Sequence, residues 1–393
     1  MNVINLMNNI YWIGVKNPEL RTFDIVMTTK KGTTYNSYLI DDEKIAIVDT
    51  VKTGYFKQYF ENLKSIIGER KVDYIIINHT ELDHSGSLKE LLEKYPDAVV
   101  YGSRPACTYL KKIINKDFKA HPIADGEILP LGKKSLKFIS APFLHWPDTM
   151  FTYIEEDGVL FSCDVFGSHY CGNDMFNDNA GDFMDEMKYY FDVIMGPFKK
   201  YVLQAMDKIE NLNLNMICTS HGPIHRTNPK QYIKLYKQWS ADVLKIHKDK
   251  NVAILYVSAY GNTKLVGELM KEQIEKAGIK AAIYDITEHK MELLIDAVDN
   301  CNAVLVGSPT INQDAVKPVW DLLSMVSPIA NRGKIAGAFG SFGWSGEAVG
   351  MISERLKSLK FKVFEPGMRV NFVPSELEKE LISEFTLKVI ESI

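Results

Sequence analysis

Four side chains that can bind metal stand within six residues of a strongly apolar segment. They are His79, Glu81, Asp83 and His84. The segment before them, Val72–Asn78, predicts a buried strand, and Ser87–Tyr95 predicts a helix that begins with a Ser87–Glu90 capping box. A protein interior cannot hold two imidazoles and two carboxylates this close together without a cation or extensive pairing. The pattern therefore predicts a metal site on a strand-to-helix loop, and the apolar strand disfavours the alternative of a solvated polar loop.

Three further candidate ligands follow predicted strands later in the same part of the chain. They are His145, Asp164 and His221. Each is weak evidence by itself, because a single histidine after a strand is more often structural. Together with the first four they give seven potential ligands, which suits two metal ions that share a carboxylate.

The pattern of predicted strands and helices changes near residue 248. Before it, short alternating strands, including a predicted hairpin of Thr33–Ile40 with Lys44–Asp49, mix with helical patterns at Met184–Glu210 and Lys230–His247. This is an α+β layout. From Val252 onward, five strands alternate with helices, which predicts a doubly wound parallel sheet. We therefore expect two domains, 1–248 and 251–393.

Composition is that of an ordinary globular protein and excludes several classes. Hydrophobic residues make up 46% and charged residues 24% of the 393 residues, and the net charge is −4. No basic stripe favours nucleic acid and no segment favours a membrane. The N-terminus does not resemble a signal peptide, so we expect a cytoplasmic protein. Five cysteines without a C-x-x-C pair disfavour a disulfide framework, a zinc ribbon and a fused rubredoxin.

The second part of the chain opens with a strand that runs into a hydroxyl-rich loop and then a helix. Such a loop cradles an anion with backbone N–H groups and a helix N-terminus. It is neither a P-loop nor a G-x-G-x-x-G motif, which disfavours a dinucleotide. A terminal monophosphate fits it better. The predicted binding residues are Ser258, Tyr260, Gly261, Asn262 and Thr263.

Two more loops should lie at the same carboxyl edge of the sheet, where ligands bind. One contains Pro309, Thr310, Ile311 and Asn312, and the other Ser341, Phe342, Gly343, Trp344, Ser345 and Gly346. Trp344 offers a stacking face for a flat heterocycle; the alternative, a core tryptophan, fits a Gly/Ser-rich loop less well. The three loops together look like those of flavodoxin, which implies FMN.

The seven candidate ligands resemble those of the metallo-β-lactamase superfamily, whose usual cluster is His-x-His-x-Asp-His followed by His, Asp and His. Glu81 stands where that pattern has its second histidine. A carboxylate is a harder ligand and favours iron or manganese over zinc, and zinc has no redox chemistry. Joined to a flavodoxin-like half, this pattern resembles the flavodiiron proteins (A-type flavoproteins) of the simplest two-domain class. The implied fold is α/β, a metallo-β-lactamase-like αββα sandwich followed by a flavodoxin-like doubly wound parallel sheet.

The resemblance implies a di-iron centre with two sets of ligands and a bridge. One iron would be held by His79, Glu81 and His145, the other by Asp83, His84 and His221, with Asp164 between them. FMN would pass electrons to the irons, which reduce O₂ to water or NO to N₂O. An external donor, a rubredoxin-like protein or a reduced deazaflavin, would supply the electrons. A head-to-tail homodimer, or a dimer of such dimers, would set one subunit's flavin against the other's metal site.

Three further residues concern the pocket around the metals. Many family members carry histidine where this chain has Asp24. Tyr190 and His169 are predicted to line the pocket, with purely structural roles as the alternative. Two other functions stay open at this point: a dinuclear metal hydrolase, against which Glu81 and the flavin half count, and a non-catalytic electron carrier or redox sensor, against which the complete ligand set counts.

Overall fold

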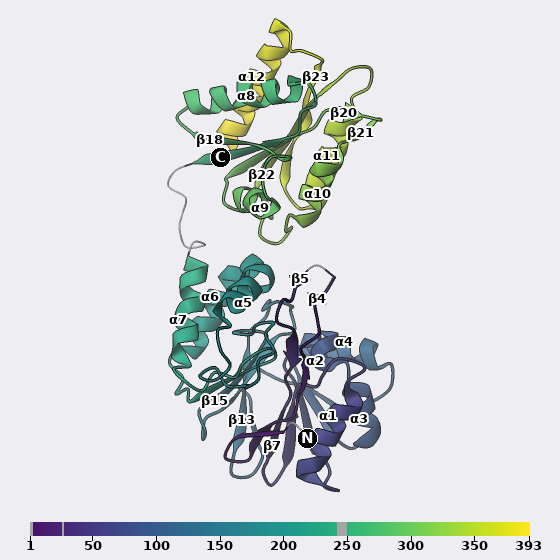
Figure 1. Ribbon diagram of the computed structural model, residues 1–393, viewed down its shortest axis with the longest axis vertical. Helices are drawn as coiled ribbons and strands as arrows, with labels where there is room; N and C mark the ends of the chain where they lie inside the picture. The colour runs from purple at the N-terminus through teal and green to yellow at the C-terminus, as the bar shows by residue number, and fades with distance from the viewer. Residues whose placement is uncertain (1–2, 26, 242–249) are drawn as a thin grey trace. The chain divides into compact units, whose positions relative to one another are not determined.

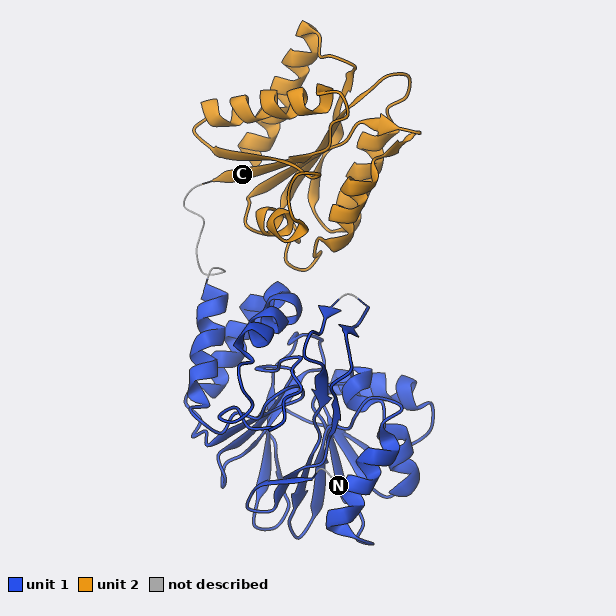
Figure 2. Cartoon of the chain, viewed as in Figure 1, with its two compact units in different colours: residues 1–244 blue, residues 245–393 orange. Residues whose placement is uncertain are grey.

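The computed structural model describes residues 3–25, 27–241 and 250–393 and divides into two compact units, Met1–Leu244 and Lys245–Ile393 (Figure 2). Residues 248 and 249 of the predicted boundary and the end of the predicted helix Lys230–His247 lie outside the described residues.

Unit 1 is built around two β-sheets. The larger has the strand order β1-β2-β7-β8-β9-β10-β11. Its strands are β1 (Ile4–Met7), β2 (Ile10–Trp12), β7 (Tyr38–Asp41), β8 (Ile45–Val48), β9 (Tyr74–Ile77), β10 (Val99–Gly102) and β11 (Ala120–Pro122). The smaller has the order β12-β13-β14-β15-β16. Its strands are β12 (Ile128–Pro130), β13 (Ser135–Ser140), β14 (Met150–Ile154), β15 (Val159–Cys163) and β16 (Met216–Thr219). Two short ribbons, β3 (Val15–Asn17) with β6 (Thr33–Tyr35) and β4 (Thr22–Phe23) with β5 (Met27–Thr28), complete the strands.

Alternation along the strands makes this unit a four-layer sandwich. On β9, Ile76 packs into the core between the sheets, whereas Ile75 and Ile77 face the core beneath the helices. Figure 1 shows helices on both outer sides of the paired sheets. They are α1 (Phe56–Ile67), α3 (Leu88–Lys94), α4 (Arg104–Ile114), α5 (Met184–Tyr190), α6 (Lys199–Ile209) and α7 (Lys230–Ser240). The four-residue helix α2 (Leu82–Ser85) belongs to the segment that follows β9. The predicted αββα sandwich is confirmed.

Unit 2 is a parallel sheet with the strand order β18-β17-β19-β22-β23. The strands are β17 (Asn251–Tyr256), β18 (Lys280–Asp285), β19 (Ala303–Gly307), β22 (Ile335–Phe342) and β23 (Lys362–Asn371), with a ribbon of β20 (Thr310–Ile311) and β21 (Asp314–Ala315). The helices are α8 (Asn262–Lys276), α9 (Met291–Asp299), α10 (Lys317–Met325), α11 (Glu347–Ser358) and α12 (Glu376–Ser392). The helices pack on both faces of the sheet, and each face has its own hydrophobic core. This is the flavodoxin-like order, as predicted.

Three local predictions were wrong. The predicted helix Met184–Glu210 is interrupted by a π-helix, Phe191–Met195, and a 3₁₀ turn, Gly196–Phe198, because Pro197 has no N–H to continue the α-helical hydrogen bonding. The predicted strand Thr33–Ile40 is two strands, β6 and β7, in different sheets.

The third error is the capping box. Ser87 precedes α3, but its φ of −95° and ψ of 3° are not those of a capping residue, and its side chain makes no cap hydrogen bond. The structure has a capping box at α12 instead, where Ser375 has φ −69° and ψ 168° and pairs with Glu378.

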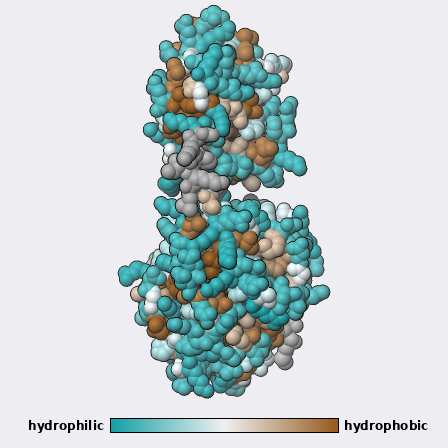
Figure 3. Space-filling model, turned by 90° about the vertical axis from the view of Figure 1, so that its left-hand side faces the viewer, coloured by the Kyte–Doolittle hydropathy of each residue, from teal (hydrophilic) through white to brown (hydrophobic). Residues whose placement is uncertain are grey.

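The surface carries few large apolar areas on the side that Figure 3 displays, where hydrophilic residues dominate and hydrophobic ones occur in small groups. In the described part of the chain, no helix combines the length and apolar character that crossing a bilayer requires.

Candidate functional site

The seven predicted metal ligands meet at one edge of the unit 1 sandwich. His79 to His84 follow β9, His145 lies between β13 and β14, Asp164 follows β15, and His221 follows β16. Five of the seven are buried, and Glu81 and His145 are half-buried. Strand ends that are far apart in the sequence thus supply one cluster.

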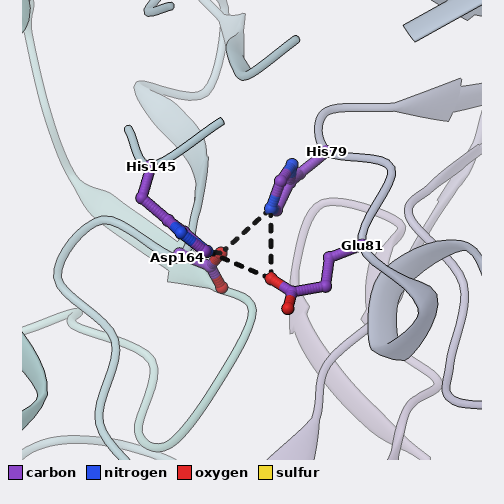
Figure 4. A group of neighbouring side chains, drawn as sticks. All are labelled: His79, Glu81, His145 and Asp164. Atoms are coloured by element: carbon purple, nitrogen blue, oxygen red, sulfur yellow. Dashed lines mark hydrogen bonds and ion pairs between the residues drawn. The ribbon is translucent and has the colours of Figure 1, made fainter. Parts of the chain in front are cut away.

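One set of ligands surrounds the Glu81 carboxylate (Figure 4). Glu81 Oε2 lies 3.0 Å from His145 Nε2 and 3.3 Å from His79 Nε2. In Figure 4 these side chains point toward one another, His79 and Glu81 from the loop after β9 and His145 from the segment between β13 and β14. Two imidazoles and a carboxylate are a suitable donor set for iron.

A second set lies beside the first. His221 Nε2 is 3.0 Å from Asp83 Oδ2, and His84 Nε2 is 3.3 Å from Asp83 Oδ1. Ligand atoms of these three residues all lie within 4.8 Å of one another. His84 turns inward here, so it is available as a ligand.

Asp164 stands between the two sets and presents one oxygen to each. Its Oδ2 lies 3.6 Å from His79 Nε2 and 3.7 Å from His145 Nε2. Its Oδ1 lies 3.0 Å from His84 Nε2 and 3.6 Å from His221 Nε2. This is the arrangement that a carboxylate shared by two cations requires.

The polar atoms at the centre fit metal ligation. Within the described residues, the following buried atoms make no hydrogen bond: His79 Nε2, both Asp83 carboxylate oxygens, His84 Nε2 and Asp164 Oδ1. Buried polar atoms in native proteins are almost always paired. Five orphaned atoms that face one another therefore indicate a cluster built to hold cations.

The charges of the cluster also indicate a site for cations. Burial opposes ionisation of Asp164, but the neighbouring imidazoles, His84 first, hold its pKa well below the usual range. Burial likewise lowers the pKa of His84, yet Asp83 and Asp164 outweigh it and raise that pKa to about 10. The carboxylates therefore demand positive charge at this point.

In unit 2, the three predicted loops follow β17, β19 and β22. Because these strands are parallel neighbours, the loops share one edge of the sheet. Gly261 has φ 86° directly before α8, a conformation that favours glycine. Thr263 Oγ1 lies 2.8 Å from Ser341 Oγ, and the buried Ser258 hydroxyl makes no hydrogen bond within the described residues. A buried free hydroxyl beside a helix N-terminus suits a phosphate.

Two observations at this edge bear on the predicted loops. Trp344 is 80% exposed, which rules out a core tryptophan, and Tyr260 is 94% exposed. Ser341 and Phe342 belong to the end of β22 rather than to a loop, because the strand continues two ladder positions beyond Gly340 against β23.

Comparisons with known proteins agree with the two predicted domain types. Residues 33–222 match the ODP family beta lactamase model and residues 254–385 match the flavodoxin model. Flavo-diiron protein FprA2 of Clostridium acetobutylicum is 42% identical over 390 residues, which cover 96% of each chain. The chain belongs to the flavodiiron protein family.

Two further relatives extend the comparison of this flavodiiron protein. The anaerobic nitric oxide reductase flavorubredoxin of Aeromonas hydrophila is 34% identical over 92% of this chain and 74% of its own. The solved structure of rubredoxin oxygen:oxidoreductase from the anaerobe Desulfovibrio gigas has a TM-score of 0.72 and 27% identity, covering 100% of this chain and 98% of that chain.

Residues that the sequence did not reveal orient two of the candidate ligands, His79 and His221. Asp148 is fully buried, and its Oδ2 lies 3.2 Å from His79 Nδ1 while accepting hydrogen bonds from the Thr80 N–H (2.7 Å) and hydroxyl (2.8 Å). His221 Nδ1 donates to the Thr34 carbonyl at 2.6 Å. Both contacts leave Nε2 directed at the centre. Asp148 stands only three residues after His145, but nothing in the sequence marks it as buried.

The two predicted pocket residues lie beside the second ligand set. The ring of His169 is 4.9 Å from that of Tyr190 and 5.0 Å from that of His221, centroid to centroid. Burial lowers the pKa of His169 well below 6.5, and His221 adds to this effect. Burial also raises the pKa of Tyr190. A neutral imidazole and a protonated phenol therefore line this side.

Asp24 lies next to Glu81. Partial burial, together with the charge of Glu81 and a hydrogen bond between the two carboxyls, raises the pKa of Asp24 to about 6. The carboxyl group of Asp24 thus interacts directly with one of the candidate ligands.

Proposed function

We propose that this flavodiiron protein takes electrons from an external donor through FMN to a di-iron centre that reduces O₂ to water, NO to N₂O, or both. The observation that carries the proposal is the position of Asp164, whose two oxygens face two matched sets of His and carboxylate ligands. A flavodoxin-like unit on the same chain supplies the electron input. The names of the relatives, one an NO reductase and one an oxygen oxidoreductase, support both substrates.

Each ligand has a specific part in this proposal. His79, Glu81 and His145 would hold one iron, Asp83, His84 and His221 the other, and Asp164 both. Two irons bound there would supply the redox chemistry for gas reduction. Glu81 biases the site toward iron and away from zinc, because a carboxylate is a harder ligand than imidazole.

The protein's own residues would prepare the gas pocket. Tyr190 keeps its hydroxyl proton, because burial raises its pKa, so it can donate a hydrogen bond into the pocket. His169 is held through Nδ1, which lies 2.9 Å from the Thr33 hydroxyl oxygen. Its buried Nε2 makes no hydrogen bond within the described residues and is the atom through which we expect it to meet a substrate or a proton.

FMN would bind at the three loops of unit 2. Ser258, Asn262 and Thr263 would receive the phosphate at the start of α8, and Trp344 would stack on the ring system. The donor would be a rubredoxin-like protein or a reduced deazaflavin. We place the functional domains at 1–248 and 251–393 and expect a cytoplasmic head-to-tail homodimer, or a dimer of dimers, in which the flavin of one copy serves the metals of another.

Metal analysis with anaerobic kinetics tests the proposal. The purified protein should hold two irons and one FMN per chain and should consume O₂, NO or both when a reduced donor is present. Asp164→Ala should lose iron and gas reduction while its FMN stays reducible, because one carboxylate serves both metals. Two zincs per chain with hydrolytic activity, or retained turnover in Asp164→Ala, would overturn the proposal.

Asp157→Asn is the matched control for that variant. Asp157 is also a buried aspartate of unit 1, but its carboxylate pairs with Lys134 and Asn8 rather than with any proposed ligand. The control should lose stability and keep iron and turnover.

A further inference from the structure

The end of β23 touches the flavin loop after β22, although no motif marks it. These two strands run side by side in the sheet (Figure 1). Beyond their last pair, Phe372 N–H donates to the Phe342 carbonyl at 2.8 Å. The Asn371 side-chain amide donates to the Gly343 carbonyl at 2.7 Å. The peptide that precedes Trp344 is therefore held from the β23 side.

Phe372 is an unusual residue at this point. Its φ of 53° lies in the left-handed region, which costs energy for a bulky side chain. Its side chain is 59% exposed, so core packing does not account for its conformation. A Cβ built on Gly343 would meet the Phe372 ring at 3.0 Å. Glycine at 343 therefore lets the ring lie directly against the loop.

The first turn of α12 anchors this segment. Glu378 Oε1 accepts a hydrogen bond from Asn371 N–H at 3.0 Å, and Oε2 accepts from the Ser375 N–H at 2.9 Å and hydroxyl at 2.7 Å. One carboxylate thus joins the capping box to the end of β23. The Asn371 amide rests on a fixed support rather than on a mobile loop.

We propose that Asn371 and Phe372 are positioning residues of the flavin site. They form a fourth segment of that site, which supports the Gly343–Gly346 loop from the β23 side. Trp344 is 80% exposed, so packing within the described residues does not fix its indole. Its place depends on the backbone at Gly343, which Asn371 holds by hydrogen bonding and Phe372 by contact. The inference rests on the proposed binding of FMN at this edge.

The test compares variants of the full-length holoprotein for FMN affinity and flavin midpoint potential. Asn371→Ala removes one hydrogen bond, with a typical net value of 0.5–1.5 kcal/mol, so the Kd of FMN should rise about 2- to 10-fold. Phe372→Ala should have a similar effect, and Phe372→Tyr should restore wild-type binding, because it keeps the ring. Both alanine variants should also shift the potential, which a general loss of stability would not do.

Asn300→Ala is the matched control. Its amide also donates to a backbone carbonyl in unit 2, that of Asp296 at 3.0 Å, at the end of α9 rather than at a flavin loop. It should lower stability and leave FMN affinity and potential unchanged. Asn371→Asp, which keeps the size and loses the donor, replaces the alanine variant if that one fails to fold.

Wild-type affinity and potential in Asn371→Ala, or in Asn371→Asp where it is used, and in Phe372→Ala would overturn the inference and leave the proposed function intact. A wild-type protein that binds no FMN would overturn the proposed function itself.

Discussion

Replacing Asp148 with asparagine should weaken iron binding without changing a single proposed ligand. Asp148 is fully buried, and its Oδ2 faces His79 Nδ1 at 3.2 Å. The negative charge there fixes the ring and makes Nε2 a stronger donor to the metal. Asparagine has the same shape but no charge. Loss of such a partner typically costs 10–100-fold in metal affinity or activity, which corresponds to about 1.4–2.7 kcal/mol.

Chelator competition measures this loss directly. Wild-type and Asp148→Asn proteins, loaded with iron under anaerobic conditions, are titrated with a chelator, and iron content is compared with gas turnover in the same samples. Thr80→Val is the control, because it removes only the 2.8 Å hydroxyl bond to Asp148 and leaves the carboxylate beside His79. We expect less than a threefold change in the control, from a lost hydrogen bond of about 1 kcal/mol that affects mainly folding. Equal iron affinity in wild type and Asp148→Asn would refute the reasoning and reduce Asp148 to a loop support.

Two other outcomes follow from the geometry. Trp344→Ala should weaken FMN retention by about 2- to 10-fold or shift its potential, because aromatic stacking is worth about 0.5–1.5 kcal/mol; unchanged FMN content and potential after purification would contradict the stacking role. Burial lowers the pKa of His225 from 6.5 to about 4. Between these two pH values the unfolded chain binds a proton that the folded chain excludes. The free energy of unfolding therefore falls by at most about 3 kcal/mol as the pH drops through this window. His225→Gln should reduce that acid loss in urea unfolding between pH 7 and 4.5, and parallel curves for the two proteins would count against it.

The sequence predicted the parts of the structure that depend on local pattern. The run Tyr74–Ile77 is apolar at every position because both of its faces are buried, Ile76 between the sheets and Ile75 and Ile77 beneath helices. His79 to His84 could be assigned to one site because they are neighbours in the chain. The five parallel strands of unit 2 could be predicted because each is followed by a helix of ordinary length.

What the sequence left out depends on contacts between distant segments. The break between β6 and β7 occurs at Asn36, whose side chain accepts from Trp12 Nε1 at 2.9 Å and donates to the Thr219 carbonyl at 2.8 Å. No periodicity in the sequence predicts a hydrogen bond between residues that are 183 positions apart. Asp148 and Asn371 were missed for the same reason. Each is a common polar residue that gains its role only when another loop folds against it.

Glu81 changes the balance of the metal site as well as its chemistry. With histidine at 81, the first ligand set would hold three imidazoles, while the second would keep two imidazoles and a carboxylate. With Glu81, both sets contain two imidazoles and one carboxylate, and Asp164 adds one oxygen to each. In the proposed di-iron centre, these two sets would offer both irons the same kinds of donor and similar ligand hardness. We therefore propose that Glu81, which stands where the usual pattern has histidine, both favours iron over zinc and gives the two ligand sets the same composition.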